Sequence, residues 1–349
     1  MKYQLRMFYA DAANQTAGSK ATQDCSEILS RLGFRNFDVP VMAKRNKIYS
    51  LMPLLMSLTH LFIQLKPGDT LLLQYPLLGI NKWMKVLIKL FRIKGCRLIC
   101  LIHDLDSLRQ LHHAWTIVME VERLNAFDVV IVHNRQMEEV LRANGLRVAT
   151  DCLTLFDYLV SPEIRRTIAA KRAALTLHQG LRNRIVFAGN LAKSTFLLRL
   201  PELPTLNFNL YGTGYALTPD IEHISWAGTF DADELPAQLH GDFGLIWDGP
   251  DLEVCTGNLG EYLRYNNPHK ASLYLLAGLP IIAPKGSAIA EFITGNKIGL
   301  TLDTLLDLPA TIKALSEDEY QQMLKNLSGI SDQLAQGGFL ETLIYKSMV

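Results

Sequence analysis

The chain has 349 residues, of which 49% are hydrophobic and 20% charged, and its formal net charge is +1. At about 100–200 residues per domain, this length predicts two domains that each bury a core of their own. The near-neutral charge excludes the strongly basic surface typical of nucleic-acid binders, so we expect no nucleic-acid partner.

The N-terminal residues and the cysteines indicate in which cellular compartment the protein is expected. The first fifteen residues carry charges within their apolar run and lack a small-residue cleavage site, so they predict a strand and not a signal peptide. The five cysteines are an odd number without C-x-x-C spacing. They predict small buried side chains in a reducing, cytoplasmic setting.

The first half of the chain alternates strand and helix signals. Its strand-like runs are short, apolar and rarely alternating, as in parallel strands covered on both faces. These runs are Tyr3–Tyr9, Asn36–Val39, Thr70–Gln74, Arg97–Ile102 and Phe127–Val132. A helix over Arg135–Asn144 is predicted between Asn134 as its N-cap and Gly145 as its stop. Repeated units of this kind predict a doubly wound α/β sheet with ligands outside the carboxyl ends of its strands.

Two further segments of this half are apolar or basic. Residues 48–65 form the most apolar stretch, but Pro53, His60 and Gln64 interrupt it, and we predict no membrane-spanning helix. This stretch is either a buried helix or a surface that docks on a membrane or a partner subunit, as in a homo-oligomer. Residues 81–94 predict a basic helix, either solvated or lying on anionic lipid at the inner face of the cell membrane.

A polar helical segment at residues 161–183 predicts the connection between the domains, and a second alternating series follows it. Its strands are predicted at Arg184–Ala188, Asn207–Tyr211, His223–Ser225, Phe243–Trp247 and Leu279–Ala283, with helices at Asp233–His240, Pro268–Ala277 and Ala288–Ile293. We expect an N-terminal domain at residues 1–165, a C-terminal domain at 166–330, and a C-terminal helix at 331–349 that packs back across the domains. A cleft between the two domains is the expected ligand site.

Two segments of the second half predict anion binding. In the first, a buried strand ends in Gly189-Asn190, and Lys193 follows near a helix start, which favours phosphate unless this is an ordinary strand-to-helix turn. In the second, Asn267 is the predicted N-cap, Pro268 the first helical residue and Gly278 the stop. Lys270 then lies in the first turn, against the helix dipole, and a bound diphosphate would resolve that conflict. The alternative is a lysine that extends into solvent from the end of the helix.

Two segments of the first half complete the candidate site. The apolar strand at 97–102 delivers His103 and Asp104 at its carboxyl end, where either side chain can act as a general base. The alternatives are a helix-capping carboxylate and a histidine satisfied near the core. The polar loop 10–20 contains Thr16 and Gly18 and is either a phosphate or acceptor contact or a plain connection.

Several motifs resemble a bacterial group of GT-B glycosyltransferases, which includes galactofuranosyltransferases and the glucosyltransferases that extend glycans on serine-rich-repeat adhesins. The most specific motif is Asn-Asn-Pro-His-Lys followed by Ala-Gly-Leu-Pro. Further similarity lies in FAGNLAKSTFL, LYGTG, GDFGLIWDG, AIAEFITGNKIGL and HDLDSLR. The resemblance implies the GT-B fold, in which two Rossmann-like doubly wound domains face each other across a cleft.

The resemblance also implies an activity and roles for individual residues. The enzyme would move a hexose (galactofuranose, glucose or galactose) from a UDP-sugar to a hydroxyl of a glycan carried on a lipid or a protein. The reaction would be inverting and would need no metal or other cofactor, with Asp104 as the base. Donor-binding residues would be Thr16, Gly18, Asn190, Lys193, Phe230, Asn267, Lys270 and Glu291, with Phe230 at the base and Glu291 at the ribose.

Three alternatives stay open. A UDP-sugar epimerase would turn over the donor without an acceptor. A non-catalytic partner would keep the fold and stabilise another transferase, although Lys193 and Lys270 count against it. Asp104-Leu-Asp106 also spells the D-x-D pair that holds a divalent metal in single-sheet GT-A transferases, but a second Rossmann-like half argues against that fold.

Overall fold

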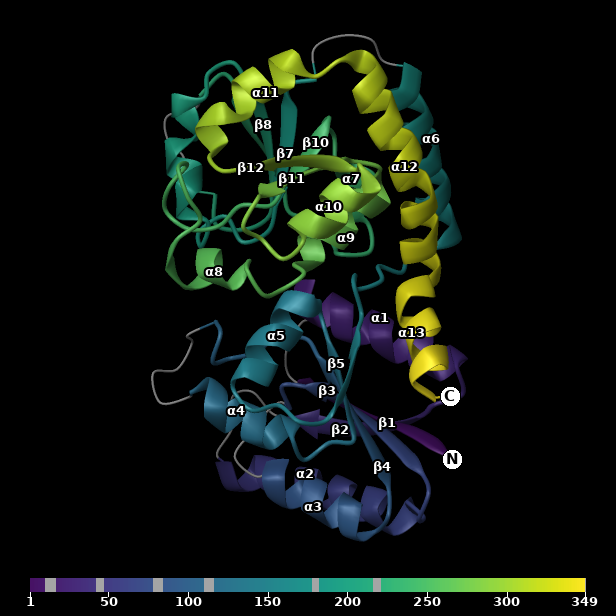
Figure 1. Ribbon diagram of the computed structural model, residues 1–349. Coiled ribbons are helices and arrows are strands. Elements are labelled where there is room, and N and C mark those ends of the chain that lie inside the picture. The colour runs from purple at the N-terminus through teal and green to yellow at the C-terminus, as the bar shows by residue number, and fades with distance from the viewer. Residues whose placement is uncertain are drawn as a thin grey trace. The chain divides into compact units, whose positions relative to one another are not determined.

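The computed structural model describes residues 1–9, 17–41, 47–77, 84–109, 116–177, 182–215 and 221–348, and the chain forms two compact units (Figure 1). Unit 1 comprises Met1–Gln15, Ser19–Leu153 and Leu340–Val349, and unit 2 comprises Thr16–Gly18 and Thr154–Phe339. The continuous part of unit 2 begins at Thr154, ahead of the expected boundary at residue 165, because the helix that spans residue 165 packs on helices of unit 2.

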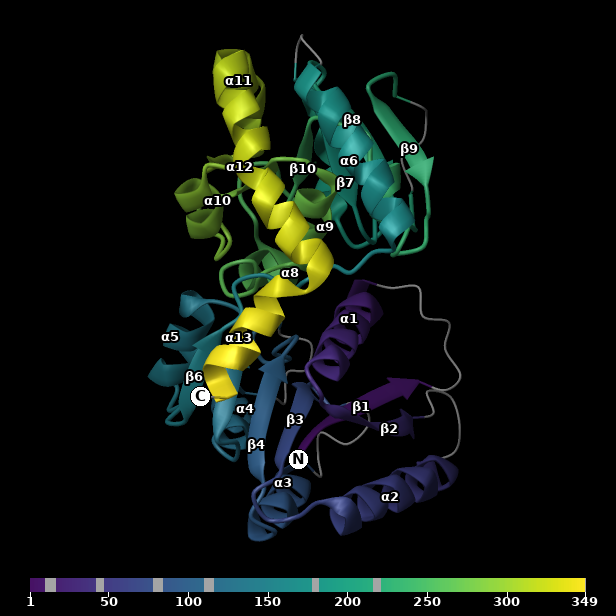
Figure 2. The same cartoon turned by 90° about the vertical axis from the view of Figure 1, so that its right-hand side faces the viewer.

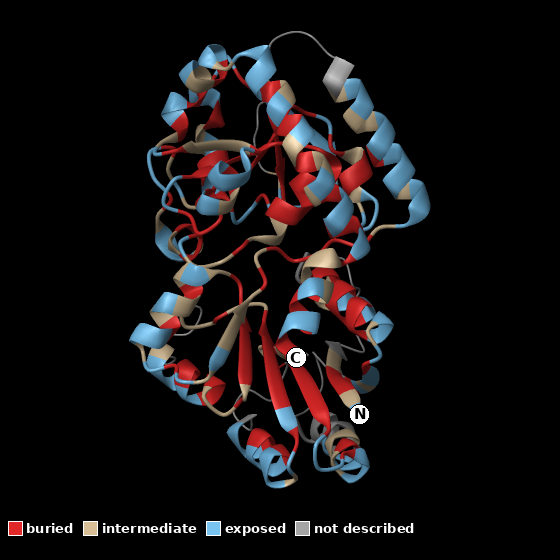
Figure 3. Cartoon of the chain, turned by 45° about the vertical axis from the view of Figure 1, so that its right-hand side comes forward, coloured by how far each residue is buried: buried red, intermediate tan, exposed pale blue. Residues whose placement is uncertain are grey.

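Unit 1 contains a six-stranded sheet in which every neighbouring pair is parallel. The strands are β1 (Lys2–Tyr9), β2 (Arg35–Val41), β3 (Thr70–Tyr75), β4 (Arg97–Ile102), β5 (Val129–Val132) and β6 (Ala149–Cys152), in the order β2-β1-β3-β4-β5-β6. The central strands are buried almost throughout, as Figure 3 shows. This agrees with the continuous apolar runs of the sequence, since both faces of the sheet are covered.

Six helices among the described residues cover this sheet. They are α1 (Ala17–Arg31), α2 (Lys47–Gln64), α3 (Met84–Ile93), α4 (Ile117–Leu124), α5 (Arg135–Ala143) and α13 (Gly338–Met348). Asn134 caps α5 as predicted, because its side chain accepts a hydrogen bond from the Met137 N–H at 2.8 Å. The last helix, α13, is joined to the sheet through Ser347, whose hydroxyl donates to Asp151 and whose carbonyl accepts from Arg97.

Unit 2 contains a second six-stranded parallel sheet. Its strands are β7 (Arg184–Ala188), β8 (Asn207–Tyr211), β9 (Ile224–Gly228), β10 (Phe243–Leu245), β11 (Ile281–Pro284) and β12 (Gly299–Leu302), in the order β12-β11-β10-β7-β8-β9. Counted from its own first strand, this is the order 3-2-1-4-5-6 of dinucleotide-binding sheets. The sheet of unit 1 has instead the 2-1-3-4-5 order of flavodoxin-like sheets, extended by one strand.

The helices of unit 2 include the predicted connection. They are α6 (Pro162–Leu177), the 3₁₀ helix η1 (Thr195–Glu202), α7 (Leu235–Gln238), α8 (Gly257–Tyr262), α9 (His269–Ala277), α10 (Ala290–Asn296), the 3₁₀ helix η2 (Leu305–Asp307), α11 (Leu308–Ala314) and α12 (Glu317–Gln336). Helices α6 and α12 run side by side in Figures 1 and 2, and α12 also packs on α9. Among the described residues, none of the helices combines the length and the hydropathy that a membrane span requires.

Four of the five cysteines are buried, and all five are free, as the sequence predicts. Burial raises the pKa of the Cys255 thiol to about 12, which keeps the thiol protonated. The cysteines therefore act as small hydrophobic side chains.

Candidate functional site

The strand order of unit 2 reverses between β7 and β10, and ligands of open α/β sheets bind outside the carboxyl ends at such a point. The segment after β7 begins with Gly189-Asn190, and the segment after β10 leads to Asp248. The Lys270 ammonium lies 3.4 Å from the Asp248 carboxylate and 4.2 Å from the centre of the Phe187 ring in β7. Three separate parts of the chain thus bring one cation and one anion to the reversal point.

Helix α9 places Lys270 there because it packs tightly on the sheet. Its Tyr274 hydroxyl accepts a hydrogen bond from the Ala188 N–H at the end of β7, at 2.8 Å. A Cβ at Gly244 of β10 would lie 2.2 Å from the Tyr274 ring, so glycine is required for this contact. The N-terminus of α9 therefore faces the carboxyl end of β7, with Lys270 as its second residue.

Glycines also bring together the two loops that follow β7 and β8. Gly212 has a φ of +128°, and a Cβ on it would lie 1.9 Å from the carbonyl oxygen of Gly189. The Gly189 N–H donates to the backbone carbonyl of Tyr211, and the Leu191 N–H donates to the backbone carbonyl of Thr213. The LYGTG motif thus supports the loop that carries Asn190.

The predicted phosphate loop after β7 leads into a short helix, which is a 3₁₀ helix. Asn190 and Lys193 are exposed, and the Lys193 N–H donates to the Asn190 side chain at 3.2 Å. The segment continues into the 3₁₀ helix η1 with Ser194 as its cap, and Ser194 donates to Asp248 at 3.2 Å. A helix therefore starts shortly after Lys193, as predicted, although it is a 3₁₀ helix, and the phosphate contact of Lys193 stays a prediction.

Asn267 was predicted to be the N-cap of α9, and this prediction is wrong. Helix α9 begins at His269 with Pro268 as the cap, because Pro268 has an extended ψ of 138°. The Asn267 side chain is buried and donates to the Thr154 carbonyl, which fixes the segment in front of the helix. Gly278 ends the helix as predicted, with a φ of +84°.

The remaining donor candidates of unit 2 lie after other strands of the same sheet. Phe230 follows β9, and its ring centre is 6.2 Å from that of Tyr211 at the end of β8. Glu291 is exposed in the first turn of α10, after β11. Because all strands of this sheet are parallel, both residues lie at the edge that holds Lys270. Their contacts with a nucleotide stay predictions.

In unit 1, the HDLDSLR segment follows β4 as predicted. The Asp104 carboxylate pairs with Arg109 at 2.8 Å, and a ring nitrogen of His103 lies 2.7 Å from the Gln74 amide oxygen of β3. Both residues are partly exposed. His103 thus has a partner on the neighbouring strand, while its role as a base stays a prediction.

A buried glutamate of α4 holds this segment in place. The Glu120 carboxylate is fully buried and accepts hydrogen bonds from the backbone N–H groups of Asp106 and Ser107, at 3.3 and 3.0 Å. It also accepts from the Tyr75 hydroxyl at 2.6 Å and from the Ser107 hydroxyl. One carboxylate therefore joins the end of β3, the segment after β4 and α4.

Thr16 lies outside the described residues, and Gly18 lies in the first turn of α1. Within the described ranges, no three His, Cys, Asp or Glu side chains gather into a group that suits a metal ion. The roles assigned to Thr16 and Gly18, and a reaction without metal, stay predictions.

Sequence reasoning missed Asp248 and Glu120. Asp248 ends the apolar run of β10, and the rule used for Asp104, a carboxylate directly after a buried strand, would have found it. Glu120 carries no such signal, because it lies in an amphipathic helix where a glutamate is ordinary.

Comparison with known proteins places the chain in a family. The description "Glucosyltransferase 3-like, N-terminal domain" matches residues 2–153, and "Glucosyltransferase 3-like, C-terminal domain" matches residues 185–347. The beta-1,6-galactofuranosyltransferase WbbI of Escherichia coli (strain K12) is 28% identical, over 95% of this chain and 94% of that protein. Glucosyltransferase 3 of Streptococcus gordonii is 25% identical, over 81% of this chain and 80% of that protein.

The fold is also that of a solved structure, Anabaena Alr3699/HepE in complex with UDP and glucose. Its TM-score is 0.60 at 14% identity, over 100% of this chain and 99% of that one. The resemblance seen in the sequence is thereby confirmed, and so is the expected pair of parallel-sheet domains. The chain belongs to the glucosyltransferase 3-like family and is a glycosyltransferase of the GT-B fold.

Proposed function

We propose that this glycosyltransferase moves a hexose from a UDP-sugar to a hydroxyl of a glycan, in the synthesis of a bacterial surface polysaccharide or glycoprotein. The observation that carries the proposal is the position of Lys270. This cation lies in the first turn of a helix whose N-terminus faces the reversal point of a dinucleotide-type sheet. Backbone N–H groups and an ammonium group at one point suit a diphosphate.

The known proteins support the same donor. Two relatives are named for transferring galactofuranose and glucose, and the structure of HepE holds UDP and glucose. Galactofuranose and glucose are accordingly the sugars that we propose first, and galactose is the third hexose that the sequence resemblance implies. The acceptor is a glycan on a lipid carrier or on a protein.

The proposed step is one displacement that inverts the anomeric carbon. The acceptor hydroxyl oxygen attacks that carbon and gives its proton to the Asp104 carboxylate, which Arg109 holds in position. The bond from the anomeric carbon to the diphosphate oxygen breaks, and its electron pair leaves with UDP. Lys270, Lys193 and the N–H groups at the start of α9 stabilise the charge on the leaving diphosphate, so that no metal is needed.

Calorimetric titration with UDP in the presence of EDTA tests the donor site. The unchanged chain is expected to bind UDP, and Lys270→Ala to bind it at least about tenfold more weakly, since a charge-assisted contact contributes about 1.5–3 kcal/mol. Lys325→Ala is the matched control, because Lys325 is an exposed lysine of α12 in the same unit and does not follow a strand of the sheet. Equal UDP affinities for the Lys270→Ala and Lys325→Ala variants would contradict the proposed donor site.

Measuring turnover of the UDP-sugar, with and without an acceptor, distinguishes a transferase from an epimerase and from a non-catalytic partner. Release of UDP that requires a glycan acceptor supports transfer, whereas conversion of the donor alone indicates an epimerase. Binding that appears only with added Mn²⁺ contradicts the metal-free step. Full UDP binding without turnover on any acceptor would favour a non-catalytic partner.

A further inference from the structure

Helices α2 and α3 of unit 1 together present a surface with an unusual composition. Both helices lie at the lower end of the ribbon in Figures 1 and 2. The ring centres of Phe62 in α2 and Phe91 in α3 are 6.4 Å apart, and the Lys94 ammonium lies 4.3 Å from the centre of the Phe62 ring. We refer to the exposed faces of α2 and α3 as the α2–α3 surface.

Helix α3 carries three stripes of side chains instead of the usual two. Leu87, Ile88 and Phe91 are buried against the sheet. A second apolar stripe points outward at the spacing i, i+4, i+7, and its residues are Val86, Leu90 and Ile93, of which Ile93 is 82% exposed. The cations Lys85, Lys89 and Arg92 flank this stripe on one side. A helix facing only water would have polar residues in place of the second apolar stripe.

Helix α2 continues the apolar character. Its Met56 and Ile63 are 68% and 72% exposed, and Leu55 is exposed beside them. These three residues lie within about 100° of each other around the helix, because each residue advances the helix by about 100°. Single exposed apolar side chains are ordinary, but six on two adjacent helices form a patch that needs an explanation.

The charge of this region is strongly one-sided. Residues 39–97 contain ten lysines and arginines, and Asp69 is their only acidic residue. Asp69 is itself paired with the N-terminal ammonium group. The whole chain has a net charge of only +1, so the rest of the chain is net negative.

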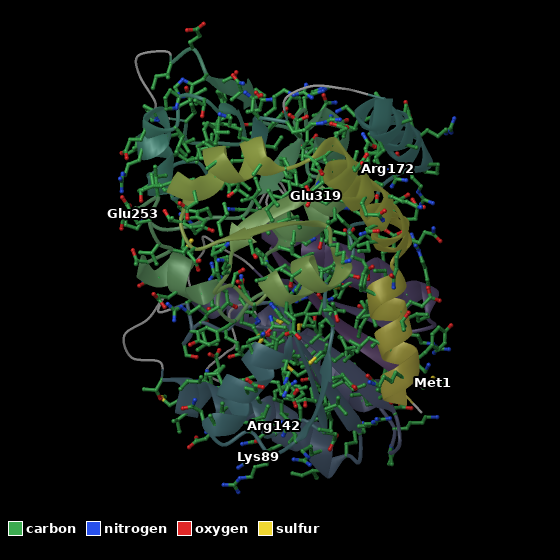
Figure 4. The ribbon with its side chains drawn as sticks, turned by 45° about the horizontal axis from the view of Figure 1, so that its top comes forward. Met1, Lys89, Arg142, Arg172, Glu253 and Glu319 are labelled. Atoms are coloured by element: carbon green, nitrogen blue, oxygen red, sulfur yellow. The ribbon has the colours of Figure 1, made fainter. Side chains whose placement is uncertain are left out.

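Carboxylates from outside the two helices neutralise part of this charge. Lys85 pairs with Glu122 at 2.7 Å and Arg92 with Asp128 at 3.3 Å. Lys89 forms no ion pair within the described part of the chain, and Figure 4 shows it at the outer edge of the ribbon. The surface therefore keeps a net positive charge next to its apolar stripes.

We propose that the α2–α3 surface docks the enzyme on an anionic lipid membrane. The apolar stripes enter the boundary between headgroups and acyl chains, while the flanking cations bind the anionic headgroups. A second copy of the chain is the weaker candidate, since a two-fold contact would bring two positive surfaces together. This docking is separate from sugar transfer and does not depend on it.

Flotation of the full chain with lipid vesicles tests the proposal. Binding is expected to vesicles of phosphatidylcholine and phosphatidylglycerol, to weaken with added salt, and to be absent with phosphatidylcholine alone. Lys89→Glu changes the charge by two units, and the partition coefficient should fall about thirtyfold, given the contribution of each unit charge near such a membrane. The triple variant Val86→Ser, Leu90→Ser, Ile93→Ser should lose at least as much, because the side chains that enter the lipid are removed.

Two matched variants control for charge and exposed apolar area. Lys325→Glu changes an exposed lysine of α12, and Leu198→Ser changes an exposed leucine of η1, both in unit 2. Both should bind vesicles like the unchanged chain. UDP binding, measured by calorimetry, should be unchanged in the variants of α2 and α3 and in both controls, since the donor candidates from Asn190 to Glu291 lie in unit 2. This measurement distinguishes a failure of membrane docking from a failure of the donor site.

Three results would overturn the proposal. One is the absence of binding to anionic vesicles, and another is binding that the triple variant keeps in full. The third is a chain that does not bind vesicles but forms a dimer in light scattering, and whose dimer the triple variant abolishes. That result would assign the α2–α3 surface to a second copy of the chain.

Discussion

At the scale of single residues, two buried ionisable groups of unit 1 support the segment that carries the candidate base Asp104. Glu120 accepts four hydrogen bonds, and His133 is buried directly after β5. Neither residue is itself a candidate for catalysis. Both are on elements that support the segment carrying His103 and Asp104.

Replacing Glu120 tests its positioning role. Glu120→Gln places an amide group against donors that need an acceptor, so the free energy of unfolding should fall by about 1–3 kcal/mol. If Glu120 positions Asp104, kcat should also fall while KM for the UDP-sugar stays unchanged. Urea unfolding and steady-state kinetics measure the two effects.

The control lies on the same helix. Glu122→Gln changes an exposed carboxylate that pairs with Lys85, and its effect on stability should be within about 0.5 kcal/mol. A loss of stability in Glu120→Gln with kcat unchanged would leave Glu120 a purely structural residue.

His133 predicts a pH dependence of stability. Burial lowers the pKa of His133 to about 4, although hydrogen bonds to the Ile102 and His103 backbone oppose this shift. The unfolded chain takes up a proton near pH 6.5 and the folded chain only near pH 4, so stability is full above pH 6.5 and falls as the pH drops toward 4. The full loss, reached below pH 4, is about 3–4 kcal/mol.

Urea unfolding at a series of pH values, for the native chain and His133→Gln, measures this effect. The slope between pH 6.5 and 4 should be smaller in the variant, which does not titrate at this position. An identical slope in both chains would assign the acid sensitivity to other groups.

At the scale of elements, α9 is the part of unit 2 on which the candidate site depends. Gly244→Ala puts a methyl group into the Tyr274 ring, so α9 must shift from the sheet. We expect a loss of about 1–3 kcal/mol in stability together with weaker UDP binding, because Lys270 moves with the helix. Thermal unfolding and calorimetry measure both.

Gly329→Ala in α12 is the matched control. A Cβ there meets no atom within 4 Å, and alanine favours a helix over glycine, so this variant should be more stable by up to about 1 kcal/mol. If Gly244→Ala leaves UDP binding unaffected, the candidate site does not depend on the packing of α9.

Strands were predictable from the sequence where they are buried and apolar. The bounds of β4, β7 and β8 are as predicted, whereas β6 and β12 were missed. Ala149–Cys152 and Gly299–Leu302 mix polar and small residues, and most of their positions are only partly buried. The start of α9 was displaced because Pro268 can occupy either the cap or the first turn. For the site, residues at strand ends were predictable, but the long-range contacts of Asp248 and Glu120 required the fold.

At the scale of the whole molecule, the two units have separate hydrophobic cores. A ligand that binds one unit should therefore stabilise mainly that unit. In scanning calorimetry with saturating UDP, we expect two transitions, of which only the one belonging to unit 2 moves upward. Lys270→Ala should abolish this movement, and a common shift of both transitions would show that the units unfold together.

The return of the chain to unit 1 has a consequence for synthesis on the ribosome. Residues 154–339 of unit 2 follow one another without a break, whereas α13 reaches unit 1 only after all of them have been translated. Unit 2 can therefore finish folding first, although its synthesis starts second. A nascent chain that stops at residue 339 therefore carries a complete core in unit 2, while unit 1 still lacks the part of α13 that contacts β4 and β6.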